Sequence, residues 1–125
     1  MAFTTYTDNA LLGHLLGSTT YAKPSPYVAL FVGNPAAGGV EVSTSGTGYA
    51  RLATAFTVSN GTATNSANLQ WSAATTAWGT ITHAAIYDAA SGGNQLMTAQ
   101  LSVSKTIGVG DIIEFLLSNL SITLT

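Results

Sequence analysis

Few side chains in this chain could carry nucleophilic or acid–base chemistry. Histidine occurs at 2 positions, His14 and His83. A serine nucleophile needs a histidine and an acid beside it, and no serine stands in a G-x-S-x-G turn. His83 alternates with Ile81, Ala85 and Tyr87, which predicts one shared strand face and a packed or hydrogen-bonded ring. The sequence therefore predicts no catalytic triad.

Three acids remain as candidates for a carboxylate pair. Glycoside hydrolysis needs two carboxyl groups about 5 to 10 Å apart across a cleft. Asp88 and Asp111 each adjoin a glycine-containing turn, where short acids hydrogen-bond backbone amides. Glu114 lies in an extended apolar run, and we expect it to meet Arg51 or solvent. These positions favour structural roles, so we expect no catalytic residue and no enzymatic activity.

Metal, cofactor and nucleic-acid binding are not indicated either. The chain has no cysteine, and its acids are too scattered to form a calcium loop. The glycine pairs at residues 38–39 and 92–93 lack the helix and the Lys-Ser/Thr of a phosphate loop. Lysine and arginine together number 3, too few for a basic stripe facing phosphates. We expect no metal, no cofactor and no nucleic acid.

Aromatic residues leave carbohydrate binding open as an alternative. Trp71, Trp78, Tyr49 and Tyr87 could stack on sugar rings if they were exposed near loop tips. In a small β domain, such residues more often fill the core. We therefore expect core positions for them.

The scarcity of charge is the most unusual property of the composition. Charged residues make up 6% of the 125 residues, against about 25% in typical soluble domains. A surface built from Thr, Ser, Asn, Gly and Ala lacks charge repulsion and favours self-association. The apolar runs are shorter than the roughly 20 residues of a membrane span. We expect one domain over residues 1–125, acting in a homo-oligomer and without a membrane partner.

Strand and turn patterns predict the elements that position these residues. Residues 78–101 form two extended runs around a Gly-Gly-Asn turn, which predicts a central antiparallel hairpin. The apolar run at residues 27–32 predicts a central strand covered on both faces. About seven or eight short strands without crossover helices are typical of an antiparallel β-sandwich or a jelly-roll-like fold. The fold class is therefore all-β.

The remaining segments connect these strands. We expect a long surface loop at residues 34–48, a strand running on from residues 48–52 through 55–58, and a turn at Asn60-Gly61. Residues 68–71 are expected to form the return strand. Ile113, Phe115 and Leu117 should share one strand face, and Leu120, Ile122 and Leu124 alternate with polar residues in a last half-buried strand.

An N-terminal arm and helix occupy residues 1–20. We expect the helix at about residues 7–16, capped by Thr7 or Asp8 and stopped by Gly17, with its leucines in one apolar stripe. Such a helix must dock on the sheet or on a neighbouring chain. The candidate protein-docking patch consists of these residues and the arm: Phe3, Tyr6, Leu11, Leu12, Leu15 and Leu16. The loop at residues 34–48 is a second candidate.

Ten short motifs follow one another along nearly the whole chain. They are NALLGHLLG at 9–17, YVALF at 27–31, NP at 34–35, GGVEV at 38–42, GYAR at 48–51, WGTITH at 78–83, DAASGGNQL at 88–96, KTI at 105–107, GD at 110–111 and LSITL at 120–124. In this order they resemble a group of small phage virion proteins of tail-fibre-like or structural type. The resemblance implies a virion component, assembled in the host cytoplasm, without catalytic residues.

The resemblance supports two functional hypotheses. The first is a capsid decoration or cement protein that bridges subunits of the major capsid protein, with a trimer suggested by the three-fold positions of such shells. The second is a tail-fibre or head-fibre module that binds a host surface receptor or glycan. A third, a cell-wall enzyme, would need the paired acids that the sequence does not indicate.

Overall fold

The computed structural model describes residues 2–116 and 119–123. All strand pairs among these residues are antiparallel. The elements are β1 (Ala2–Phe3), α1 (Thr5–Leu15), β2 (Tyr27–Val32), the 3-10 helix η1 (Pro35–Ala37), β3 (Val40–Glu41), β4 (Leu52–Ala53), β5 (Phe56–Ser59), β6 (Thr62–Asn65), β7 (Leu69–Gln70), β8 (Gly79–Tyr87), β9 (Gln95–Ile107), β10 (Glu114–Phe115) and β11 (Ser121–Thr123).

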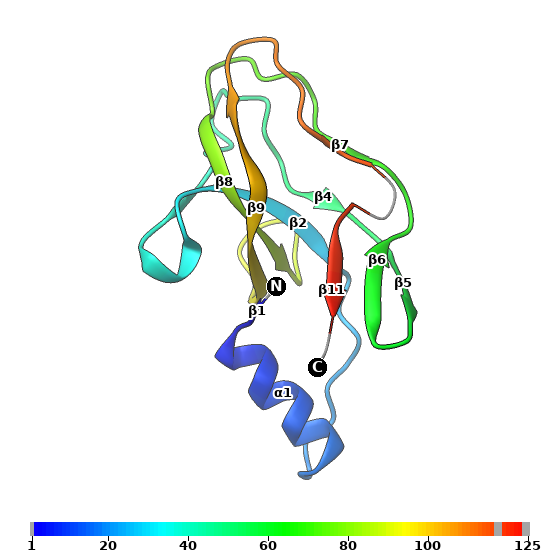
Figure 1. The fold of residues 1–125 in the computed structure, drawn as a ribbon. Coiled ribbons are helices and arrows are strands. Elements are labelled where there is room, and N and C mark those ends of the chain that lie inside the picture. Colours follow the sequence, from blue (N-terminus) through cyan, green and yellow to red (C-terminus); the bar gives the residue numbers. More distant parts are fainter. Residues whose placement is uncertain (1, 117–118, 124–125) are drawn as a thin grey trace.

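Two layers enclose the core (Figure 1). The main sheet has the order β1-β9-β8-β2-β3, with β4 also paired to β2. The second layer consists of the sheet β11-β6-β5 and the pair β10-β7. The core cluster joins residues of both layers, among them Leu30, Ile81, Trp71 and Ile113. The all-β sandwich is therefore confirmed, in more and shorter segments than expected, whereas a jelly-roll topology stays a prediction.

The central hairpin forms as predicted. β8 and β9 pair from Gly79 opposite Ile107 to Tyr87 opposite Gln95. Gly92 and Gly93 in the connecting turn have φ of 63° and 73°. A side chain at Gly93 would collide with the Asp88 carboxylate, so both the backbone angle and the space there require glycine.

The most apolar run forms the predicted central strand. β2 lies between β8 on one side and β3 and β4 on the other. Val28, Ala29 and Leu30 have no exposed surface. Because adjacent residues point to opposite faces, both faces of this sheet are covered at β2.

An irregularity in the β8–β9 pairing separates Ile81 from His83. Ile81 lies opposite Lys105, but His83 lies opposite Gln100, so the register shifts between them. Ile81 packs in the core, whereas His83 pairs with Phe31 on the outer face of the sheet. The predicted common face was therefore wrong for Ile81, because a bulge interrupts the two-residue alternation.

Residues 34–48 are more ordered than the predicted loop. Asn34 caps η1, where its side-chain oxygen accepts a hydrogen bond from the Ala36 amide at 2.9 Å. β3 then pairs with the end of β2. The expected surface loop is therefore interrupted by a capped turn and a two-residue strand, which return the chain to the sheet edge.

The second layer contains a hairpin that the sequence indicated only in part. Asn60 and Gly61 turn the chain with φ of 52° and 73°, as the Asn-Gly signal predicts. The expected continuous strand is broken into β4 and β5, which belong to different sheets. The return strand is β6 rather than residues 68–71, which contain β7.

The C-terminal pattern is confirmed where the structure describes it. Ile113 is buried and Phe115 is half-buried. Ile112 and Glu114, which alternate with them, are exposed, as expected for the opposite face of the strand. β11 pairs with β6, and its Ile122 is buried. The predictions for Leu117 and Leu124 fall outside the described residues.

Asn65 joins the second layer through its side chain. It is fully buried, and its Nδ2 donates to the carbonyls of Ala67 at 2.8 Å and Leu116 at 2.9 Å. Its Oδ1 accepts from the Leu120 amide at 2.9 Å. One amide therefore fixes the chain entering β11 against β6.

Replacing this amide tests its structural role. We expect Asn65→Ala to lower the free energy of unfolding by about 2 to 3 kcal/mol, because buried backbone groups lose their partners. Denaturant unfolding measures the change. Asn119→Ala, at an exposed asparagine, is the matched control and should change stability by less than about 0.5 kcal/mol. Equal effects of both substitutions would contradict the assignment.

Candidate functional site

The acids near turns bind backbone amides. Asp88 accepts the Asn94 amide at 2.7 Å and the Asn94 side chain at 3.0 Å. These hydrogen bonds lower the pKa of Asp88. Asp111 accepts the Gly108 amide at 2.8 Å. Both structural roles are as predicted.

Arg51 does not meet Glu114. Glu114 is exposed on β10. Arg51 pairs with Glu41 through two hydrogen bonds of 2.8 Å, from Nε to Oε2 and from Nη2 to Oε1. Of the two expected environments of Glu114, solvent is therefore confirmed and Arg51 is not, because β3 brings Glu41 to the sheet edge beside Arg51. No cluster of three His, Asp or Glu side chains suited to a metal occurs among the described residues.

The Glu41 carboxylate also closes a gap at the edge of β2. Between β3 and β4, the Leu30 amide donates to the Tyr49 hydroxyl at 3.0 Å. That hydroxyl donates to Glu41 Oε2 at 2.7 Å. Burial would raise the pKa of Glu41, but its hydrogen bonds from Arg51 and Tyr49, with the Arg51 charge, lower it overall. Burial raises the pKa of Tyr49 well above its ordinary value.

Arg51 continues this network onto the central hairpin. Its Nη1 donates to the carbonyls of Ala89 at 3.0 Å and Gly92 at 2.8 Å. Its guanidinium lies 3.6 Å from the centre of the Tyr87 ring, which stacks on Phe31. Hydrogen bonds to Glu41 raise the pKa of Arg51. The outer face of the sheet is thus covered by an ion pair over an aromatic stack.

His83 and the tryptophans hold structural positions as well. His83 is half-buried, and its Nδ1 lies 2.8 Å from the Thr82 hydroxyl. Trp71 and Trp78 are buried in the core, as predicted. Among the aromatic residues that the structure describes, only Tyr6 is exposed, and it lies on α1. The aromatic platform that a glycan site would use at loop tips is therefore not formed by these rings.

The N-terminal helix is attached to the main sheet at its first turn. It begins at Thr5 with Thr4 as its cap, two residues before the predicted start. Thr7 was a wrong choice of cap, because its hydroxyl donates to the Leu96 carbonyl at 2.7 Å and is buried there. Thr4 donates to the neighbouring Gln95 carbonyl at 2.6 Å. These two threonines fix α1 to the start of β9.

The predicted docking patch divides into two parts. Leu12, Leu15 and Leu16, which we call the leucine tip, are 56%, 73% and 83% exposed. They lie on α1 and its C-cap, which project from the sheets (Figure 1). Tyr6 is 42% exposed and Leu11 is half-buried. Phe3 does not join them, because β1 places it between the two layers.

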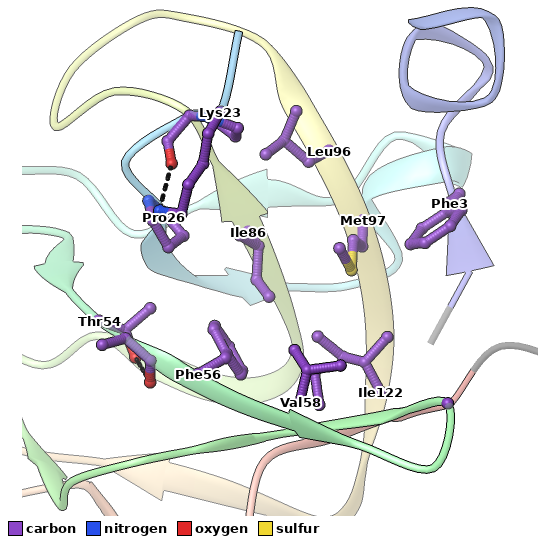
Figure 2. Close-up of a pocket in the computed structure, with 14 residues that line it drawn as sticks. Phe3, Lys23, Pro26, Thr54, Phe56, Val58, Ile86, Leu96, Met97 and Ile122 are labelled. Atoms are coloured by element: carbon purple, nitrogen blue, oxygen red, sulfur yellow. Dashed lines mark hydrogen bonds between the residues drawn. The ribbon is translucent and has the colours of Figure 1, made fainter. Parts of the chain in front are cut away.

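An apolar pocket opens where Phe3 lies. It has a volume of about 500 Å³, and Figure 2 shows side chains of both layers facing one another across it. Among the described residues that line it, Lys23 alone carries a charge. We call this site the apolar pocket; it is lined by Phe3, Lys23, Pro24, Pro26, Thr54, Ala55, Phe56, Val58, Gly61, Ala63, Ile86, Leu96, Met97 and Ile122. Of these residues, the sequence analysis named only Phe3 as a candidate site residue.

At the other end of the molecule, three loops bind one another. Residues 43–48, 72–77 and 108–112, which we call the loop end, lie opposite α1 (Figure 1). The Thr75 hydroxyl donates to the Gly46 carbonyl at 2.9 Å, and the Gly110 amide donates to the Ala74 carbonyl at 2.7 Å. Val109 is exposed there.

In the described part of the chain, no helix is long and apolar enough to cross a membrane.

Fold and site together define a small β-sandwich protein in which Glu41, Asp88 and Asp111 have structural roles and the N-terminal helix is largely uncovered. Residues 2–123 match the family described as Podophage GP4 fiber I protein gp80. Because the match spans nearly the whole chain, the protein belongs to this family. It is a phage protein of fibre type, and the resemblance to phage virion proteins is confirmed at that level. A search of curated proteins found no match.

The Glu41 network predicts acid sensitivity. Since the folded-state pKa of Glu41 lies below its ordinary 4.5, the ionised carboxylate stabilises the fold above that pH. This stability is lost as the pH falls below about 4.5 through the folded pKa. We expect Glu41→Gln to cost about 2 kcal/mol at pH 7, and the cost to shrink progressively as the pH is lowered below 4.5, by denaturant unfolding over a pH series.

Glu114→Gln is the matched control for that experiment, because Glu114 is exposed. It should leave the free energy of unfolding unchanged throughout the pH series. A cost of Glu41→Gln that stays the same at low pH would contradict the role given to the ionised carboxylate.

Proposed function

We propose that this protein is a non-enzymatic module of a phage fibre that binds other protein through its α1 end. The observation that carries the proposal is the uncovered leucine tip in a chain that belongs to a fibre family. Exposed apolar patches on soluble proteins mark interaction sites more often than chance. The low charge of the chain suits burial in such contacts, whose centres are depleted of charge.

The positions of the acids support the absence of catalysis. Asp88 and Asp111 bind turn amides, and Glu41 is held by Arg51 and Tyr49. A carboxylate occupied in this way has no free oxygen pair to present to a substrate across a cleft. Glycosidase activity is therefore not part of the proposal.

The fibre role replaces capsid decoration as the preferred hypothesis. The family description names a fibre protein, and nothing in its wording refers to the capsid shell. A fibre module also needs one end for assembly and another for exposure. The apolar α1 end and the loop end divide these tasks.

A second candidate function, contact with the host surface, is favoured at the loop end. Its three loops are held by mutual hydrogen bonds, including one from the Thr75 amide to the Thr47 carbonyl at 3.0 Å. Preformed loops lose little conformational entropy on binding. Val109 and Ile112 are exposed beside the polar residues of these loops, and receptor or glycan contact would involve this surface.

Labelling of purified particles tests the fibre assignment. We expect gold-labelled antibodies against this protein to mark fibres by electron microscopy and to leave the capsid shell unmarked. Its copy number by quantitative mass spectrometry should be far below that of the major capsid protein. Labelling spread over the shell, at a comparable copy number, would restore the decoration hypothesis.

Competition for host cells tests the loop end. We expect purified protein to reduce adsorption of its phage, and Val109→Asp to abolish this competition, because a charge would be buried in the contact. The matched control is Val40→Asp, at an exposed valine on β3 outside the loop end, which should compete like the wild type. Equal competition by both variants would exclude Val109 from the host contact.

A further inference from the structure

The protein has two apolar features that no described residue covers or fills. The leucine tip projects from the fold, and the apolar pocket is hollow (Figures 1 and 2). The tip does not fill the pocket of its own chain, because Leu15 and Leu16 are exposed and α1 makes its main contacts with β1 and β9. Within the described part of the chain, neither feature has an occupant, so each can take one from another molecule.

The helix itself requires such an occupant. Isolated helices shorter than about 12 to 15 residues are marginal in water, so their stability comes from packing an apolar face. α1 has 11 residues, and Thr7 is its only buried one. Covering a leucine side chain contributes about 1.5 to 3 kcal/mol, so contact with another surface would stabilise the C-terminal half of α1.

The pocket suits aliphatic side chains better than sugars. Phe3, Phe56, Met97 and Ile122 line it, and the side-chain hydrogen-bonding groups among its described residues belong to Lys23 and Thr54. A sugar buried there would leave most of its hydroxyl groups without partners, at a cost for each. Leucine side chains carry no such cost.

Charge at the rim of the pocket also fits the leucine tip. Lys23 is exposed there, and its ammonium donates to the Pro24 carbonyl at 3.5 Å. The leucine tip lies at the C-terminal end of α1, where the helix dipole is negative. The nearby ring of His14 accepts a hydrogen bond from the Tyr21 amide at Nδ1, so that nitrogen carries no proton. A cation at the rim thus meets the negative end of a helix.

We propose that the leucine tip of one copy inserts into the apolar pocket of a second copy, with Lys23 of the receiving copy facing the end of the incoming α1. This deepens the proposed function, since it makes a second copy of this chain the partner of the α1 end. The two surfaces differ, so the contact is heterologous. Repetition of a heterologous contact closes into a ring or extends as a filament.

Two variants that each remove one side of the contact test the proposal. Leu15→Asp combined with Leu16→Asp destroys the tip at exposed positions, and Val58→Asp places a charge at the pocket on an exposed strand residue. Analytical ultracentrifugation should find the wild type as an oligomer and each variant as a monomer, with association weakened at least about a hundredfold. Val103→Asp, exposed on β9 outside both sites, is the matched control and should assemble like the wild type.

Mixing the two variants gives the decisive result. One intact tip and one intact pocket remain, so an equimolar mixture should form a dimer that grows no further. A mixture that stays monomeric would overturn the proposal, as would a Val58→Asp protein that assembles normally, which would indicate contact between tips. A monomeric wild type that binds a fluorescent fatty acid in the pocket would also overturn it, in favour of an aliphatic ligand.

This experiment is independent of the fibre assignment. Particle labelling reports where the protein resides, whereas sedimentation reports how its copies meet. Failure of association with labelled fibres would refute only the tip-and-pocket contact. Normal association with labelled capsid shells would refute only the fibre role.

Discussion

The ion pair between Arg51 and Glu41 is the interaction on which the arrangement of the main sheet depends. The Arg51 side chain is 8% exposed and the Glu41 side chain 23%, so both charges are largely withdrawn from water. Burying two charges is favourable only if their hydrogen bonds are satisfied. Glu41 accepts hydrogen bonds from Arg51 and Tyr49. The Tyr49 hydroxyl in turn accepts a hydrogen bond from the Leu30 amide in the gap between β3 and β4. Arg51 reaches the carbonyls of the β8–β9 turn. One pair thus connects a sheet edge, a loop and the central hairpin, in a chain with only 3 lysine and arginine residues.

Local signals in the sequence predicted the parts of the fold that local forces decide. β2 follows from an uninterrupted apolar run, and the turns at Asn60-Gly61 and Gly92-Gly93 follow from residues that tolerate positive φ. The partner of Arg51 could not be predicted in this way, because β3 is a two-residue strand whose only signal is its pairing with β2. The bulge beside His83 was hidden for the same reason, since it arises from the register of β9 against β8.

The same distinction between local signals and strand pairing applies to the candidate site. The leucine tip could be predicted because its residues are neighbours in sequence and share helical spacing. Phe3 was grouped with these leucines because it is close in sequence, yet β1 turns it toward the second layer. The apolar pocket gathers residues from β1, β5, β8, β9 and β11, and such a set has no signature in the order of the chain. It forms only where strands of both layers come together in the fold.

The two ends of the molecule differ in the side chains that they expose. At the α1 end, leucine side chains are exposed on a helix that Thr4 and Thr7 fasten to β9, while the loops of the loop end are held by hydrogen bonds to one another. The proposed contact between the leucine tip and the apolar pocket would be heterologous, so each copy would meet its neighbours in one orientation. Weak net charge removes the repulsion that would oppose such neighbours. The shortage of ions, costly for an isolated monomer, is therefore consistent with a protein whose stable form is an assembly.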